Sequence, residues 1–265
     1  MLRDVIASDG VRIACEVSGS GPPLVMVHGA GSARWSFDLL RPHLDDRFTV
    51  IALDRRGRGD STDGSGYSLE RECDDVAAVV RDAGDGAFLF GHSYGGLVAA
   101  GAALRLELPR LALHEPAMGG ALSTEDVIGR WEGLIRDGER DTVTREFLRE
   151  IGYDDADIGR LARTPLWEAR RRIVSTLPRE LRAELAHRFD EWPLGNLDLP
   201  VLLLVGSESP AWAVRSVEAH ANAIARAETR VLEGHGHGAN LTAPELLAAE
   251  LGRFFATGSD VSSEP

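Results

Sequence analysis

The sequence predicts a doubly wound, mostly parallel α/β sheet that is interrupted once by a helical insertion. Short apolar runs recur along the chain, helix-like segments separate several of them, and residues 119–197 show helical periodicity without a convincing strand. Continuous apolar runs of this kind are typical of strands buried on both faces of a parallel sheet. Because strands and helices alternate, the helices should cover both faces of that sheet.

The first two strands are expected around Val5 and over residues 11–17, where polar and apolar side chains alternate. Asp9 and Gly10 stand between these stretches, and an Asp-Gly pair is a strong hairpin signal. Five further strands are expected at the apolar runs 24–28, 48–53, 87–92, 111–115 and 201–206. The sheet should therefore begin with a hairpin and continue with buried strands.

Helices are expected between several of these strands. The clearest covers residues 68–84, where Ser68 precedes four acidic residues. Acidic side chains near the start of a helix interact favourably with its dipole. A last helix is expected from about Ala243 to Phe255. Residues 257–265 contain nothing to bury and are expected to form a flexible tail.

The helical insertion divides the chain into two parts. We expect an α/β core from residues 1–117 and 197–256, and a helical cap from residues 118–196. The cap sequence is rich in charged residues and contains several aromatic residues. It should lie over the C-terminal ends of the strands as a lid.

Composition restricts the class of function. The chain has 265 residues, of which 43% are hydrophobic and 27% charged, as is typical of soluble globular proteins. Its net charge of −13 argues against binding to nucleic acid or to an anionic membrane. The two cysteines form no disulfide framework, and no apolar run resembles a secretion signal or a membrane span. We therefore expect a cytoplasmic protein that acts on a small molecule; a homodimer is compatible with the sequence.

Residues 91–95, with the sequence GHSYG, fit the G-x-S-x-G pattern of a nucleophile elbow. The pattern requires small flanking residues because the serine must occupy a strained turn between a strand and a helix. An apolar strand precedes this serine and a helix of small residues follows it. Ser93 is therefore the candidate nucleophile, at a helix N-terminus whose N–H groups can stabilise negative charge.

An activated serine also needs an oxyanion hole and a base. The glycine-rich turn His28-Gly29-Ala30-Gly31 directly follows a predicted strand. The amides of Ala30 and Tyr94 are the two expected oxyanion donors. A dinucleotide-binding interpretation of this turn fails because no third glycine follows at the required spacing. The base should be a histidine on the loop before the last helix, which offers His235 and His237.

Together these features resemble the α/β-hydrolase fold enzymes, and the resemblance extends from about Leu2 to Ala256. It rests on the His-Gly turn, the loop DRRGRGDS at 54–61, the elbow, the cap and the sequence GHGH at 234–237. The resemblance implies a mostly parallel eight-stranded sheet and selects His237 as the base. It implies no cofactor. A metal site at His235 and His237 would lack a third ligand nearby, so no metal is expected.

The acid that orients the histidine departs from the usual family pattern. Its usual position is three residues after Gly206, where this sequence has Ser209. Glu208 stands one residue earlier and is one alternative. The other is Glu115, which ends an otherwise apolar strand, where a charge is costly unless it is needed. A group of haloalkane dehalogenases and the zearalenone lactonases place their acid at this second point, and Glu115 is the preferred candidate.

Two further motifs have both a functional and a structural interpretation. The loop at 54–61 could bind an anion, but in the family its aspartate and arginines tie loops together, and we expect this structural role. Trp167 lies in a cap segment similar to one that contacts substrate in the zearalenone lactonases. It is therefore a candidate substrate-binding residue, and the alternative is packing between cap and core.

A serine nucleophile narrows the chemistry, because the dehalogenases and epoxide hydrolases of this fold attack with an aspartate. We expect a serine hydrolase that cleaves a carboxylic ester or lactone through an acyl-enzyme, with a Ser-His-Glu triad. The same residues could serve a C–C bond hydrolase, a thioesterase or a perhydrolase. A hydrolase homologue that binds a ligand with little turnover is the alternative from a different class.

Overall fold

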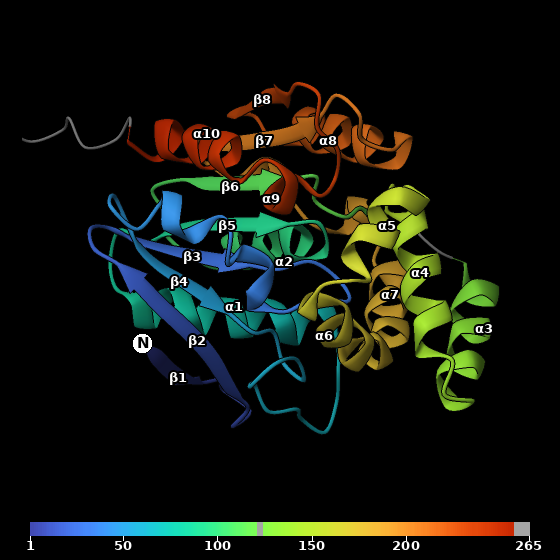
Figure 1. Cartoon of the computed structure of the whole chain (residues 1–265). Coiled ribbons are helices and arrows are strands. Elements are labelled where there is room, and N and C mark those ends of the chain that lie inside the picture. The colour runs from blue at the N-terminus through green and yellow to red at the C-terminus, as the bar shows by residue number, and fades with distance from the viewer. Residues whose placement is uncertain (121–123, 257–265) are drawn as a thin grey trace, which may run out of the picture.

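The computed structural model describes residues 1–120 and 124–256 and contains one eight-stranded sheet (Figure 1). The strands are β1 (Leu2–Ile6), β2 (Arg12–Gly19), β3 (Pro23–Val27), β4 (Thr49–Leu53), β5 (Phe88–His92), β6 (Leu111–His114), β7 (Val201–Gly206) and β8 (Ala227–Leu232). Their order in the sheet is β1-β2-β4-β3-β5-β6-β7-β8. β2 is antiparallel to both of its neighbours, and strands β3 to β8 all run parallel to one another. The predicted fold class is confirmed.

Helices cover both faces of the sheet, and each face has its own hydrophobic core. On one face lie α1 (Leu69–Ala83), α2 (Tyr94–Ala103) and α8 (Ala211–Ala223); on the other lie the short α9 (Ala239–Thr242) and α10 (Pro244–Ala256). In β3, Val25 and Val27 join the first core, whereas Leu24 and Met26 join the second. Because alternate side chains are buried on opposite faces, this strand reads as a continuous apolar run.

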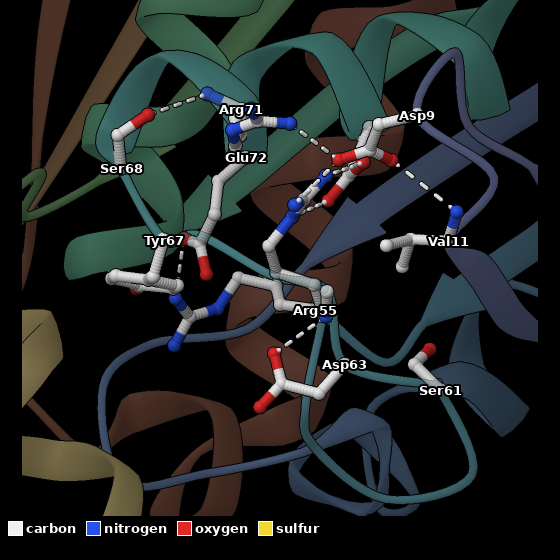
Figure 2. A network of polar contacts seen from close by, with 12 residues as sticks. Asp9, Val11, Arg55, Ser61, Asp63, Tyr67, Ser68, Arg71 and Glu72 are labelled. Atoms are coloured by element: carbon white, nitrogen blue, oxygen red, sulfur yellow. Dashed lines mark hydrogen bonds and ion pairs between the residues drawn. The ribbon is translucent and has the colours of Figure 1, made fainter.

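The first hairpin is tied to helix α1 by charged side chains. Gly10 has a φ of +85°, which the turn requires, and Asp9 accepts a hydrogen bond from the Val11 amide at 3.2 Å. Asp9 also forms an ion pair with Arg71 of α1 at 2.7 Å. Figure 2 shows this contact beside the N-terminal cap of α1, where the Ser68 hydroxyl accepts from the Arg71 amide at 3.2 Å. The expected start of this helix is confirmed.

The described part of the chain between β6 and β7 is mostly helical, as the sequence predicts. Its helices are α3 (Glu125–Arg136), α4 (Arg140–Glu150), α5 (Asp155–Leu161), α6 (Pro165–Ile173) and α7 (Leu177–Ala186), and we call residues 125–186 the helical insertion. In Figure 1 these helices lie beyond the arrowheads of the parallel strands, at the C-terminal edge of the sheet. Side chains from the strand ends and from the insertion can therefore meet there.

Two further expectations concern the C-terminal tail and membrane-spanning segments. The predicted flexible tail, residues 257–265, lies outside the described residues. Among the helices that the structure describes, none combines the length and the apolar character that a bilayer-spanning segment needs.

Candidate active site

Ser93 occupies a strained turn between β5 and α2. Its φ of 56° and ψ of −127° lie outside the regions that non-glycine residues usually adopt. The flanking glycines are required by crowding: a Cβ on Gly91 would lie 2.5 Å from the Gly95 carbonyl oxygen, and a Cβ on Gly95 would collide with the carbonyls of Val27 and His28. The elbow geometry thus explains why small residues flank this serine.

Glu115 is the other strained residue, and it directly follows β6. In residues 1–120 and 124–256, only Ser93 and Glu115 combine a side chain with a positive φ, and that of Glu115 is 44°. The two turns are connected, because the Ser93 amide donates to the His114 carbonyl at 2.9 Å. Backbone strain of this kind persists where the surrounding structure enforces it, and it is concentrated at functional sites.

The imidazole of His237 pairs with Glu115. The His237 Nδ1 lies 2.7 Å from Glu115 Oε2, and both side chains are buried. The second carboxylate oxygen, Oε1, accepts from the Gly206 amide at 2.8 Å and from the Ser209 hydroxyl. Ser209 is the position at which the usual pattern has its aspartate, and here its hydroxyl donates to the carboxylate of the other candidate position.

The contacts of Glu115 keep its carboxyl ionised. Burial raises the pKa of this carboxyl, but the hydrogen bond from His237, the nearby imidazoles and the Gly206 amide together lower the pKa to about 2. The negative charge of the Glu115 carboxylate, next to Nδ1 of His237, favours the tautomer with its proton on Nδ1. The other ring nitrogen, Nε2, is then free to accept a proton.

Glu208 is placed differently. Its side chain is exposed, and its backbone amide donates to the His235 carbonyl at 3.0 Å. Of the two candidate acids, only Glu115 is brought to His237. His235 is partly buried in the same loop.

Two more histidines pack beneath His237. The rings of His92 and His237 have centroids 4.7 Å apart, and those of His92 and His114 are stacked at 4.9 Å. His92 Nε2 donates to the His237 carbonyl at 2.9 Å, which fixes the position of the loop. Burial lowers the pKa of His92 well below its usual value and that of His114 to about 4. Both rings are therefore neutral packing groups.

The glycine-rich turn after β3 lies against Ser93. A Cβ on Gly29 would lie 3.1 Å from the Ser93 Cβ, and Ala30 lines the same cavity as Ser93 and His237. Arg55 supports the turn by donating to the Gly29 carbonyl at 2.9 Å. Tyr94 is the first residue of α2, so its amide has no acceptor within the helix. Ala30 and Tyr94, which are predicted to supply the oxyanion donors, thus lie close to the serine.

The loop at 54–61 forms a buried ionic network rather than an open anion site. Arg55 and Arg58 both pair with Glu72 of α1, at 2.7 and 2.9 Å, and both also pair with Glu180 of α7. Arg56 pairs with Asp75 of α1 at 2.6 Å. Figure 2 shows part of this network, with Arg55, Glu72 and Tyr67 below α1. Its arginines already have carboxylate partners, and Glu180 connects the core to the helical insertion.

Ser93 and His237 line a small cavity, which we call the Ser93 cavity. It offers about 20 Å³, room for about one water molecule. One wall comes from the helical insertion, through Phe147, Ile151, Tyr153 and Arg170. A ligand larger than one water molecule needs more room than this cavity offers.

A larger groove of about 490 Å³ lies elsewhere, between the start of α1 and helix α7. Its lining includes Tyr67, Arg179 and His187 and shares no residue with the Ser93 cavity. Volume therefore does not identify the reactive site; the strained serine and the paired imidazole do.

Helix α6 lines the Ser93 cavity with Arg170 and not with Trp167, the residue that the sequence suggests. Trp167 is buried within the insertion, where its indole N–H donates to Asp141 at 2.7 Å and Arg145 lies over its ring. Trp167 does not line the cavity, and these two contacts lie within the insertion, not between cap and core. Arg170, three residues later on the same helix face, does line it. The i,i+3 spacing from a buried tryptophan is the signal that could have identified this arginine.

Comparisons with known proteins identify the family to which this fold belongs. A sequence model of the Alpha/beta hydrolase family matches residues 24–250. A solved alpha/beta hydrolase from Sphaerobacter thermophilus is 35% identical, with a TM-score of 0.82, and the match covers 96% of this chain and 100% of that one. A pimeloyl-[acyl-carrier protein] methyl ester esterase from Neisseria meningitidis is 29% identical over 91% of this chain and 78% of the esterase.

A shorter match has higher identity. A 2-(acetamidomethylene)succinate hydrolase from Mesorhizobium japonicum is 43% identical over 79 residues. These residues are 29% of this chain and only 28% of that hydrolase. The match therefore covers little more than a quarter of the length of this relative.

Proposed function

The chain is a member of the alpha/beta hydrolase family, and from this premise we propose that it is a serine hydrolase that cleaves carboxylic esters or lactones through an acyl-enzyme. One observation carries the proposal. The strained Ser93 lines the same small cavity as His237, whose imidazole pairs with Glu115, at the C-terminal edge of the sheet. A nucleophile, a base and an acid that orients the base are the components of a catalytic triad.

In the proposed reaction, Ser93 Oγ attacks the carbonyl carbon while His237 Nε2 takes the hydroxyl proton. The Ala30 and Tyr94 amides bind the oxyanion, and each such donor typically lowers the barrier by about 2.7–4 kcal/mol. The tetrahedral intermediate collapses, the C–O bond to the alcohol breaks, and His237 returns the proton to the leaving oxygen. Water then attacks the acyl-enzyme in the same way and releases the acid.

Glu115 holds the imidazole and stabilises its protonated form in both steps. Its pKa of about 2 means that it stays ionised and does not itself take the proton. The Ser209 hydroxyl and the Gly206 amide hold the carboxylate from the other side. The neutral His92 and His114 leave His237 as the base at this site.

The ester class is supported by the methyl ester esterase to which this chain is similar over 91% of its length. The substrate is proposed to be a small molecule, and we propose a cytoplasmic location, where the free, buried Cys15 and Cys73 would stay reduced.

A panel of short p-nitrophenyl esters, thioesters and macrolactones, including zearalenone, tests the proposal when products are identified by mass. We expect ester or lactone hydrolysis that Ser93→Ala abolishes. Hydrolysis at an unchanged rate in Ser93→Ala would exclude Ser93 as the nucleophile. Turnover of thioesters alone would favour a thioesterase, and binding without turnover would favour a ligand-binding homologue.

A further inference from the structure

Arg170 is a buried cation on the wall of the Ser93 cavity. Its side chain belongs to α6, and the residue is only 6% exposed. Its guanidinium lies over the ring of Trp35, at 5.0 Å from the ring centroid, and its Nε has no hydrogen-bond acceptor. Within the described chain, no carboxylate forms an ion pair with Arg170; burial lowers its pKa, and the only opposing influence comes from Tyr153.

Other arginines on the same helix and in the buried core have carboxylate partners. Arg171 and Arg172, the next residues on α6, both pair with Glu168, at 3.0 and 3.4 Å. The fully buried Arg55 and Arg58 share two carboxylates. An unpaired buried charge costs several kcal/mol, so this chain elsewhere neutralises its buried guanidinium groups. Arg170 is the exception, because it is buried without a carboxylate partner, and it lines the Ser93 cavity.

Further polar atoms around this cavity lack partners. The Ser32 and Ser36 hydroxyls and the Asn240 side-chain oxygen all line the Ser93 cavity, and none of these atoms makes a hydrogen bond. Asn240 is held in place, because its amide nitrogen donates to the Ser36 carbonyl at 2.8 Å. Buried polar groups usually have partners, and a group of unpartnered ones in one cavity indicates a ligand that supplies them.

We propose that Arg170 binds a free carboxylate of the substrate, so that the enzyme cleaves esters or lactones of acids that carry a second, ionised carboxyl group. The inference rests on the proposed ester hydrolysis and specifies its substrate class. A guanidinium binds a carboxylate through two parallel N–H···O bonds, and the Ser32 and Ser36 hydroxyls offer further donors to the same anion. The bound carboxylate also neutralises the charge that the protein leaves unpaired.

The test compares two esters that differ only in charge. Monomethyl succinate has a free carboxylate, and methyl levulinate replaces it with an acetyl group of nearly the same size. Homologous pairs with one or two more methylenes in the acyl chain extend the comparison. In at least one of these pairs, we expect wild-type kcat/KM to be at least 10-fold higher for the charged ester. In Arg170→Met this ratio should fall towards one, mainly through KM for the charged ester.

Two variants act as controls. Arg172→Met removes an exposed arginine of the same helix and should leave the ratio unchanged. Arg170→Lys keeps the charge but loses the paired hydrogen bonds, so its ratio should lie between those of wild type and Arg170→Met. Thermal unfolding of all variants reports whether they are folded. An unchanged ratio in folded Arg170→Met, or no charge preference in any wild-type pair, would overturn the inference while leaving the ester hydrolysis intact.

A failure of the proposed hydrolysis itself would look different. Neither member of any pair would then be cleaved, and a fluorophosphonate would not label Ser93. Calorimetric titration of wild type and Arg170→Met with monomethyl succinate would then decide the inference by itself. Binding that is at least 10-fold weaker in Arg170→Met supports the carboxylate site, and equal or absent binding rejects it.

Discussion

The Nδ1 of His237 lies 2.7 Å from Oε2 of Glu115, a residue 122 positions earlier in the chain. The carboxylate comes from the end of β6 and not from the loop after β7, where Glu208 is exposed. The loop after β7 still contributes, because Ser209 donates a hydrogen bond to the same carboxylate.

The first prediction separates the two candidate acids. Glu115→Gln should reduce kcat by about 10³–10⁴-fold, because a neutral amide neither holds the required tautomer nor stabilises the imidazolium. Glu208→Gln removes an exposed carboxylate and should change kcat by less than about twofold. Steady-state kinetics on one p-nitrophenyl ester measure both. Near-normal turnover in Glu115→Gln would assign the role of acid elsewhere.

The second prediction moves the acid back to its usual position. Because the Ser209 hydroxyl already contacts Glu115, an aspartate at 209 would place a carboxylate close to His237. We expect Glu115→Ala to lower kcat/KM by about 10³-fold and the addition of Ser209→Asp to restore at least about 10-fold. Ser207→Asp in the same background is the matched control, because Ser207 is exposed and should restore nothing. Equal activity of the two double variants would contradict the geometry.

The third prediction concerns the pH dependence of stability. Glu184 of α7 is fully buried without a hydrogen-bond partner for its carboxyl oxygens, and burial followed by repulsion from Glu180 raises its pKa to about 8. The folded protein therefore keeps a proton that the unfolded chain releases above its ordinary pKa of 4.5, so stability falls as pH rises from 4.5 to about 8.

Glu184→Met removes this dependence. We expect the variant to be more stable than wild type at pH 8, by roughly 2 kcal/mol or about 4–8 °C in Tm. At pH 5 the two proteins should differ much less. Calorimetric scans at both pH values provide the measurement, and an equal effect at pH 5 and pH 8 would show that Glu184 does not titrate in this range.

The fourth prediction uses the neighbouring glutamate, one helical turn away. Burial raises the pKa of Glu180, but Arg58, Arg55 and the Thr176 hydroxyl outweigh this effect and lower the pKa to about 2. Glu180→Met should therefore destabilise the protein by about 3 kcal/mol at pH 7, since it leaves two buried guanidinium groups with only Glu72. Urea unfolding measures the change. Two similar substitutions on one helix should thus have opposite signs, and a stabilising Glu180→Met would refute this account of the network.

Much of the site is visible in the sequence because its signals are local. Backbone crowding requires glycine at both sides of Ser93, and Gly31 of the glycine turn and Gly234 of the GHGH segment have positive φ values of 55° and 73°. The order of strands and helices follows from the alternation of apolar runs, and the Asp9-Gly10 hairpin follows from its turn residues.

Other parts depend on contacts between distant segments. The sequence favours Glu115 over Glu208 through a resemblance and the cost of a buried charge, but the bond to His237 and the support from Ser209 appear only when β6 and β7 are side by side. Helical periodicity places Trp167 and Arg170 on one face of α6, yet which of them reaches the cavity depends on how α4 and α6 pack. The unpaired state of Arg170 is likewise invisible without its neighbours.

The central claim is that Ser93 is a nucleophile activated by His237. The most direct measurement is labelling with a fluorophosphonate, followed by mass spectrometry of the digested protein. The account predicts a single modified peptide with the adduct on Ser93, no labelling in Ser93→Ala, and labelling at least about 100-fold slower in His237→Asn. An adduct on another residue, or labelling of Ser93 at the same rate without His237, would contradict it.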